Sequence, residues 1–96
     1  MTESDYQAKL IKKLKRVFPG CEVLKNDPSY LQGILDLTLF WGRQWAMLEV
    51  KASANSVAQA NQEYYVRRLN DMSFAAFIYP ENEEEVLAAL QEAFAS

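Results

Sequence analysis

The chain has 96 residues, half of them apolar, and a formal net charge of −3, which suits one hydrophobic core and therefore one domain over residues 1–96. A lone Cys21 and the absence of histidine exclude an internal disulfide, a Cys/His zinc site and catalysis by a Ser–His or Cys–His pair. No apolar stretch approaches the roughly 18 residues of a membrane span, and the first residues are polar without a signal-peptide profile, so we expect a cytoplasmic protein.

A first helix is predicted over residues 4–18. Apolar residues recur there every three or four positions, as on a helix with one buried face. They are Tyr6, Leu10, Ile11, Leu14, Val17 and Phe18. The Pro19-Gly20 pair ends this helix. A short strand over residues 21–25 and a polar loop over residues 26–32 then lead to a hairpin.

The hairpin is centred on Gly42-Arg43. Glycine at the first central position suits a two-residue type II′ turn, which pairs Trp41 with Gln44. This register gives one face a continuous apolar surface and predicts it as the core side. The residues of that face are Leu35, Leu37, Leu39, Ala46, Leu48 and Val50. The opposite face carries Asp36 directly across from Glu49, with Lys51 two residues further along.

Helix, strand and helix follow the hairpin. Ser56 is the predicted N-cap of a helix that reaches about Leu69, and an apolar strand follows over residues 74–79. Pro80 and Asn82 introduce a last helix. Its core positions at helical spacing are Val86, Leu87, Leu90 and Phe94. The crossover between the last two strands predicts parallel pairing. We therefore expect an α/β domain of order αβββαβα, with a mixed central sheet flanked by helices.

Asp36 and Glu49 are the candidate metal ligands. Like charges directly opposite on a sheet are destabilising unless something compensates, and a divalent cation is the simplest compensation. Two carboxylates and a backbone carbonyl, here that of Val50, suit Mg²⁺, with Mn²⁺ as a substitute. Lys51 would lie beside the metal and orient or deprotonate an attacking water. The alternatives are a solvated carboxylate at Asp36 and a structural ion pair between Glu49 and Lys51, which contributes about 0 to 1 kcal/mol when exposed.

Asp36, then Glu49-Val50-Lys51, then Gln62 at the start of a Tyr-rich helix resemble the PD-(D/E)XK nuclease superfamily. The likeness, to virus-type replication-repair nuclease (VRR-NUC) domains and phage Holliday-junction resolvase-like proteins, covers nearly the whole chain. It implies a restriction-endonuclease-like core and a Mg²⁺-dependent endodeoxyribonuclease. Its catalytic residues would be Asp36, Glu49 and Lys51, and Gln62 would organise the site or contact a phosphate; an ordinary surface amide is the alternative for Gln62. Leu35 stands where the family usually has proline.

The family also carries an acidic residue on its first helix. Counted back from Leu10-Ile11, this position is Gln7. Glu3 lies one turn earlier on the same face and is the alternative catalytic carboxylate, reaching the site directly or through a water. Asp5 points elsewhere on the helix.

The resemblance implies DNA as substrate, preferably branched as in a Holliday junction or flap, cleaved to leave a 5′-phosphate. It also implies a homodimer, acting in the host cytoplasm if the chain is phage-encoded. The candidate DNA contacts are Lys25, Asn26, Ser29, Tyr30 and Tyr65. The alternatives are a solvated loop over residues 26–32 and simple packing for Tyr64 and Tyr65. Trp41 and Trp45 flank the hairpin turn, where they either cover its tip or form a dimer contact.

The acidic residues are segregated. Five acids and no base follow Pro80, so residues 1–79 carry ten bases against eight acids, a net charge of +2. Bases cluster at Lys9, Lys12, Lys13, Lys15 and Arg16, and again at Arg67 and Arg68. Such clusters can follow phosphates, or they can be the solvated faces of amphipathic helices.

Two other functions stay open. One is a catalytically inactive DNA-binding module of the same fold, suggested by Gln7 where an acid is expected. The other is a small phage-like protein-interaction domain whose acidic C-terminal helix docks a partner. Deletion of residues 83–96 separates the second from the others, because a docking tail is dispensable for folding and a core helix is not.

Overall fold

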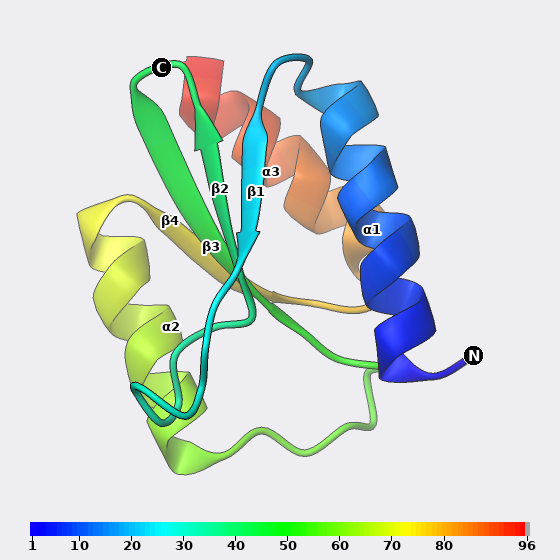
Figure 1. Cartoon of the computed structure of the whole chain (residues 1–96), viewed down its shortest axis with the longest axis vertical. Helices are drawn as coiled ribbons and strands as arrows, with labels where there is room; N and C mark the ends of the chain where they lie inside the picture. The colour runs from blue at the N-terminus through cyan, green and yellow to red at the C-terminus, as the bar shows by residue number, and fades with distance from the viewer. Residues whose placement is uncertain (96) are drawn as a thin grey trace.

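In the computed structural model, which describes residues 1–95, a four-stranded mixed sheet carries helices on both faces (Figure 1). The elements are α1 (Glu3–Val17), β1 (Glu22–Lys25), β2 (Leu37–Trp41), β3 (Gln44–Val50), α2 (Ala60–Met72), β4 (Phe74–Ile78) and α3 (Glu83–Ala95). The order αβββαβα and the mixed sheet predicted from the sequence are confirmed. None of the described helices is long and apolar enough to cross a membrane.

The sheet has the order β1-β2-β3-β4. The first three strands are antiparallel neighbours, and β4 returns through α2 to pair with β3 in parallel, as predicted. The β2–β3 register is also the predicted one, from Trp41 opposite Gln44 to Leu37 opposite Leu48. Gly42 has φ +63°, and no residue other than glycine has a positive φ within the described chain. Positive φ at the first turn position alone fits the type II′ turn.

Two apolar clusters hold the layers together. α1 and α3 cover one face of the sheet and α2 covers the other (Figure 1). The larger cluster lies beneath α1 and α3, and the predicted core positions of both helices are buried in it or packed against it. Those buried in it are Tyr6, Leu10, Leu14, Phe18, Val86, Leu87, Leu90 and Phe94. Because α3 supplies four of these side chains, it is part of the core.

Leu35 was placed on the wrong face by the sequence pattern. It is fully buried, but with Met47 and Ala75 in the smaller cluster beneath α2. The other five residues predicted for that face lie in the larger cluster, as expected. The β2–β3 ladder ends at the Leu37–Leu48 pair, so the alternation of side chains does not extend back to Leu35.

The predicted N-cap of α2 was also wrong. Ser56 closes a turn in which its amide donates to the Ser53 carbonyl, and the helix begins four residues later at Ala60. Gln59 is the N-cap, and its backbone N–H donates to the side chain of Gln62 at 3.0 Å. This reciprocal arrangement is a capping box, and it fixes Gln62 in the first turn of the helix.

The two tryptophans beside the hairpin turn are packed into the protein. The Trp41 indole N–H donates to the Pro19 carbonyl at 2.9 Å, and its ring lies 5.1 Å from that of Phe18. Trp45 packs against the smaller cluster. Both are partly buried, which favours the prediction that they cover the tip of the hairpin.

Candidate active site

Asp36 is held at the carboxyl end of β3 by its side chain. Its Oδ2 accepts a hydrogen bond from the Val50 N–H at 2.9 Å. In an uninterrupted ladder of this register, Val50 would pair with the backbone of Leu35, so the carboxylate replaces a main-chain partner. The N–H and C=O of one strand residue point to the same side, which places the Val50 carbonyl toward Asp36 as well.

Glu49 is the one buried charged side chain among the described residues, with 2% of its surface exposed. Its Oε2 accepts from Gln62 Nε2 at 2.9 Å and lies 3.3 Å from Lys51 Nζ. Its Oε1 is buried and has no hydrogen-bond partner in the part of the chain that is described. A buried polar atom without a partner costs roughly 1–3 kcal/mol, and more when it is charged. This oxygen is therefore available to accept a hydrogen bond or to bind a cation.

The pKa of Glu49 is raised to about 7, chiefly by burial and in addition by the negative charge of Asp36. Lys51 opposes both effects but does not cancel them. A cation bound beside Asp36 would favour the ionised form of Glu49. The electrostatics thus agree with the unpaired oxygen.

Lys51 and Gln62 complete a polar network with Glu49. Lys51 Nζ donates to Gln62 Oε1 at 2.9 Å, and Gln62 returns its amide N–H to Glu49. The capping box at the start of α2 orients Gln62 for this bridge. The structure therefore brings together four of the predicted site residues, Asp36, Glu49, Lys51 and Gln62, and the backbone of Val50.

Asn26 supports the segment that carries Asp36. Its backbone N–H donates to the Asp36 carbonyl at 2.8 Å, and its side-chain amide donates to the Leu35 carbonyl at 2.8 Å. Its side-chain oxygen accepts from Thr38 Oγ1 at 3.0 Å. The side chain of Asn26, which was predicted to contact a phosphate, thus makes hydrogen bonds that support the loop instead. The sequence did not predict this positioning role. The one sequence feature that could have indicated it is that Asn26 directly follows a strand.

Gly33 lets the same loop approach α2. Its φ is +92°, and a Cβ at this position would lie 2.7 to 2.9 Å from side-chain atoms of Asn61. Only glycine combines that backbone conformation with that close approach. The loop that delivers Asp36 therefore packs against the helix that delivers Gln62.

The first helix adds no carboxylate to the pair. Glu3 is exposed, and in residues 1–95 no group of three or more Asp, Glu, His or Cys side chains is gathered where it could hold a metal ion. Gln7 is half-buried and makes no described hydrogen bond to Asp36 or Glu49. Glu3 therefore does not form a group of three carboxylates with Asp36 and Glu49.

The remaining candidates for DNA contact are scattered. Lys25 pairs with Leu37, whose side chain lies in the cluster beneath α1 and α3, so Lys25 is on the face opposite Glu49. Ser29 hydrogen-bonds Asp27, and Tyr65 packs against the smaller cluster and the ring of Tyr64. Tyr30 is 91% exposed at the loop tip.

Two carboxylates and a backbone carbonyl are a ligand set that Mg²⁺ accepts, since this ion is usually bound by one or two carboxylates together with water and substrate phosphates. No family model, curated protein or solved structure gives a significant match to the chain.

Proposed function

We propose that the protein is a metal-dependent DNA endonuclease with its active site at Asp36, Glu49 and Lys51. The observation that carries the proposal is the buried Oε1 of Glu49, which has no partner among the described residues. A structural ion pair with Lys51 would leave that oxygen unexplained, because Lys51 engages Oε2. A divalent cation held by Oε1, Asp36 and the Val50 carbonyl accounts for it.

Each polar side chain of the network has a role in this proposal. Asp36 and Glu49 would hold the ion, which when bound polarises a phosphoryl oxygen and lowers the pKa of coordinated water. Lys51 is partly buried beside Glu49, where its ammonium group can orient a water and offset negative charge that develops on the phosphate. Gln62 holds Lys51 and Glu49 at a fixed separation.

The proposal includes a restriction-endonuclease-like core and a branched DNA substrate. The observed αβββαβα order and mixed sheet support the first. A homodimer is proposed as well, because α2 leaves part of its sheet face uncovered: Leu24 and Phe40, 51% and 44% exposed, lie there. A species that stays monomeric in sedimentation, with and without junction DNA, would contradict the dimer.

Cleavage of labelled duplex, flap, single-stranded and four-way-junction DNA in Mg²⁺ or Mn²⁺ tests the function. Asp36→Asn and Glu49→Gln keep the shape of each side chain and remove its charge, and Asp71→Asn removes an exposed carboxylate far along α2 as a control. Loss of metal assistance costs several kcal/mol, so we expect both site variants to be slower by about a hundredfold or more. The control should cleave like the wild type.

A DNA-binding module without catalysis is the second candidate. It is favoured by the absence of a third carboxylate beside Asp36 and Glu49 in residues 1–95. This function predicts DNA binding that is unchanged by EDTA and no cleavage of any substrate by folded protein. Cleavage that needs metal and Glu49 would exclude it.

A further inference from the structure

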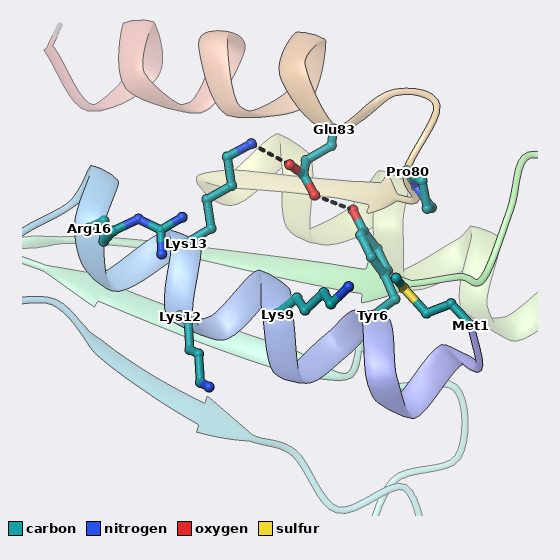
Figure 2. A pocket seen from close by; sticks show the side chains of 8 residues that line it. All are labelled: Met1, Tyr6, Lys9, Lys12, Lys13, Arg16, Pro80 and Glu83. Atoms are coloured by element: carbon teal, nitrogen blue, oxygen red, sulfur yellow. Dashed lines mark hydrogen bonds and ion pairs between the residues drawn. The ribbon is translucent and has the colours of Figure 1, made fainter.

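A basic cavity lies outside the candidate active site, between α1 and the segment that leads into α3 (Figure 2). Its volume is about 410 Å³. Four of its lining residues are bases from successive turns of α1: Lys9, Lys12, Lys13 and Arg16. Their spacing of three and four positions puts them on one face of the helix.

One of these bases is neutralised inside the cavity. Lys13 pairs with the Glu83 carboxylate, which also accepts a hydrogen bond from the Tyr6 hydroxyl at 2.8 Å (Figure 2). Burial raises the pKa of Glu83, but the hydrogen bonds from Lys13 and Tyr6 outweigh it and hold this pKa below its ordinary value. Glu83 is therefore ionised at neutral pH and occupied within the protein.

The other three bases have no such partner. Lys9, Lys12 and Arg16 are exposed and make no ion pair with any described residue. The charged side chains that line the cavity, four bases and one acid, carry a net charge of +3. Between Lys9 and Arg16 the helix rises about 10 Å, a length over which one strand of B-form DNA carries about three phosphates, measured along the duplex axis.

The cavity also borders the edge of the sheet that carries the candidate site. Pro80 lines it two residues after Ile78, and the Ile78 carbonyl accepts from the Lys51 N–H at 2.9 Å. We propose that Lys9, Lys12 and Arg16 form a phosphate track, on which the sugar–phosphate backbone of a nucleic acid lies as it leaves Asp36 and Glu49. The direction of the backbone, from Asp36 and Glu49 onto the track, rests on the proposed nuclease function. The binding of phosphates to the track does not depend on cleavage.

A nucleic acid fits this surface better than a membrane does. The apolar face of α1 is buried against the sheet through Tyr6, Leu10 and Leu14, so the helix has no apolar face with which to enter a lipid interface. A strand of regularly spaced phosphates, in contrast, can engage all three unpaired bases at once. A single inorganic phosphate can engage only part of the track.

The test is the salt dependence of DNA binding without metal. The track variant Lys9→Gln/Lys12→Gln/Arg16→Gln keeps long side chains with good helix propensity. The control Lys15→Gln/Arg43→Gln/Arg67→Gln removes the same charge from exposed positions outside the cavity. Fluorescence anisotropy of a labelled duplex in EDTA, between about 50 and 200 mM KCl, gives the slope of log K against log salt. Circular dichroism checks that both variants are folded.

The track predicts that its variant lowers the magnitude of this slope by about 2.7, the value for three phosphate contacts, and that the control changes it by less than about 1. Equal slopes for the two variants, or a wild type that binds no DNA, would overturn the proposal. The proposal would also be overturned if inorganic phosphate bound the wild type as tightly as DNA does. It would be overturned too if the track variant weakened the binding of anionic vesicles and left the binding of DNA unchanged. Parallel cleavage in Mg²⁺ keeps the questions separate: a wild type that binds through the track and cleaves nothing refutes the nuclease and leaves the track standing.

Discussion

Replacement of Glu49 by glutamine should change how stability depends on pH. Burial and the charge of Asp36 raise the pKa of Glu49 to about 7 in the folded protein, against an ordinary value of 4.5. Below about pH 4.5 the carboxyl is protonated in both the folded and the unfolded protein, so it does not change the free energy of unfolding. Between about pH 4.5 and 7 the unfolded chain is already ionised while the folded protein is still protonated, so the folded state loses stability until the carboxyl is ionised in both states. At 1.36 kcal/mol per pH unit, the loss reaches about 3 kcal/mol.

Glutamine cannot ionise, so Glu49→Gln lacks this loss. We expect the free energy of unfolding of the variant, minus that of the wild type, to rise by about 3 kcal/mol between pH 4 and pH 8.5 in EDTA. Urea unfolding followed by tryptophan fluorescence at a series of pH values measures the difference, and the titration of carboxylates that do not interact with Glu49 cancels in it. A difference that stays constant within about 0.5 kcal/mol over this range would contradict the prediction, because Glu49 would then titrate as an ordinary exposed carboxyl.

Three further changes have defined outcomes. Gln62→Ala removes the bridge between Glu49 and Lys51, and we expect Mn²⁺ to bind about 10 to 100 times more weakly by calorimetry; unchanged affinity would exclude the positioning role. Gly33→Ala places a methyl group 2.7 Å from the Asn61 side chain, at a backbone position with a φ of +92°. The free energy of unfolding in urea should therefore fall by about 1–3 kcal/mol, and an unchanged value would mean that the loop does not pack there. Leu90→Ala, at a fully buried position of α3, should cost about 2–5 kcal/mol, and deletion of residues 83–96 should abolish the cooperative transition; a folded deletion would restore the interpretation of α3 as a docking tail.

Much of the fold was predictable because its signals are local. The Gly42-Arg43 turn sets the register of β2 and β3 without help from the rest of the chain. Helical spacing of large apolar residues likewise gave α1 and the core face of α3. From the register alone, Asp36 came to lie beside the strand that carries Glu49.

The two errors arose at hydrogen bonds that the pattern of residue types does not show. Leu35 continues the period of two in the sequence, but the Asp36 carboxylate takes the Val50 N–H and the ladder ends there. Ser56 is a good N-cap by composition, yet its amide is used in a turn with Ser53. The pattern of residue types specified neither the long-range contact of Asp36 with Val50 nor the local turn at residues 53–56.

The decisive features of the site depend on tertiary structure. The unpaired oxygen of Glu49 exists because α2 and the Asp36 segment bury that carboxylate, and no sequence pattern gives its burial. The basic stripe of α1 is visible in the sequence, but the cavity is not. It requires Glu83 and Pro80 to lie across from that helix.

Titration of the protein with Mn²⁺ in a calorimeter measures whether the unpaired oxygen of Glu49 and the Asp36 carboxylate hold a cation. We expect saturable binding by the wild type and by Asp71→Asn, and binding at least about tenfold weaker in Asp36→Asn and in Glu49→Gln. Binding that is absent from the folded wild type, or equal in all four proteins, would contradict this expectation.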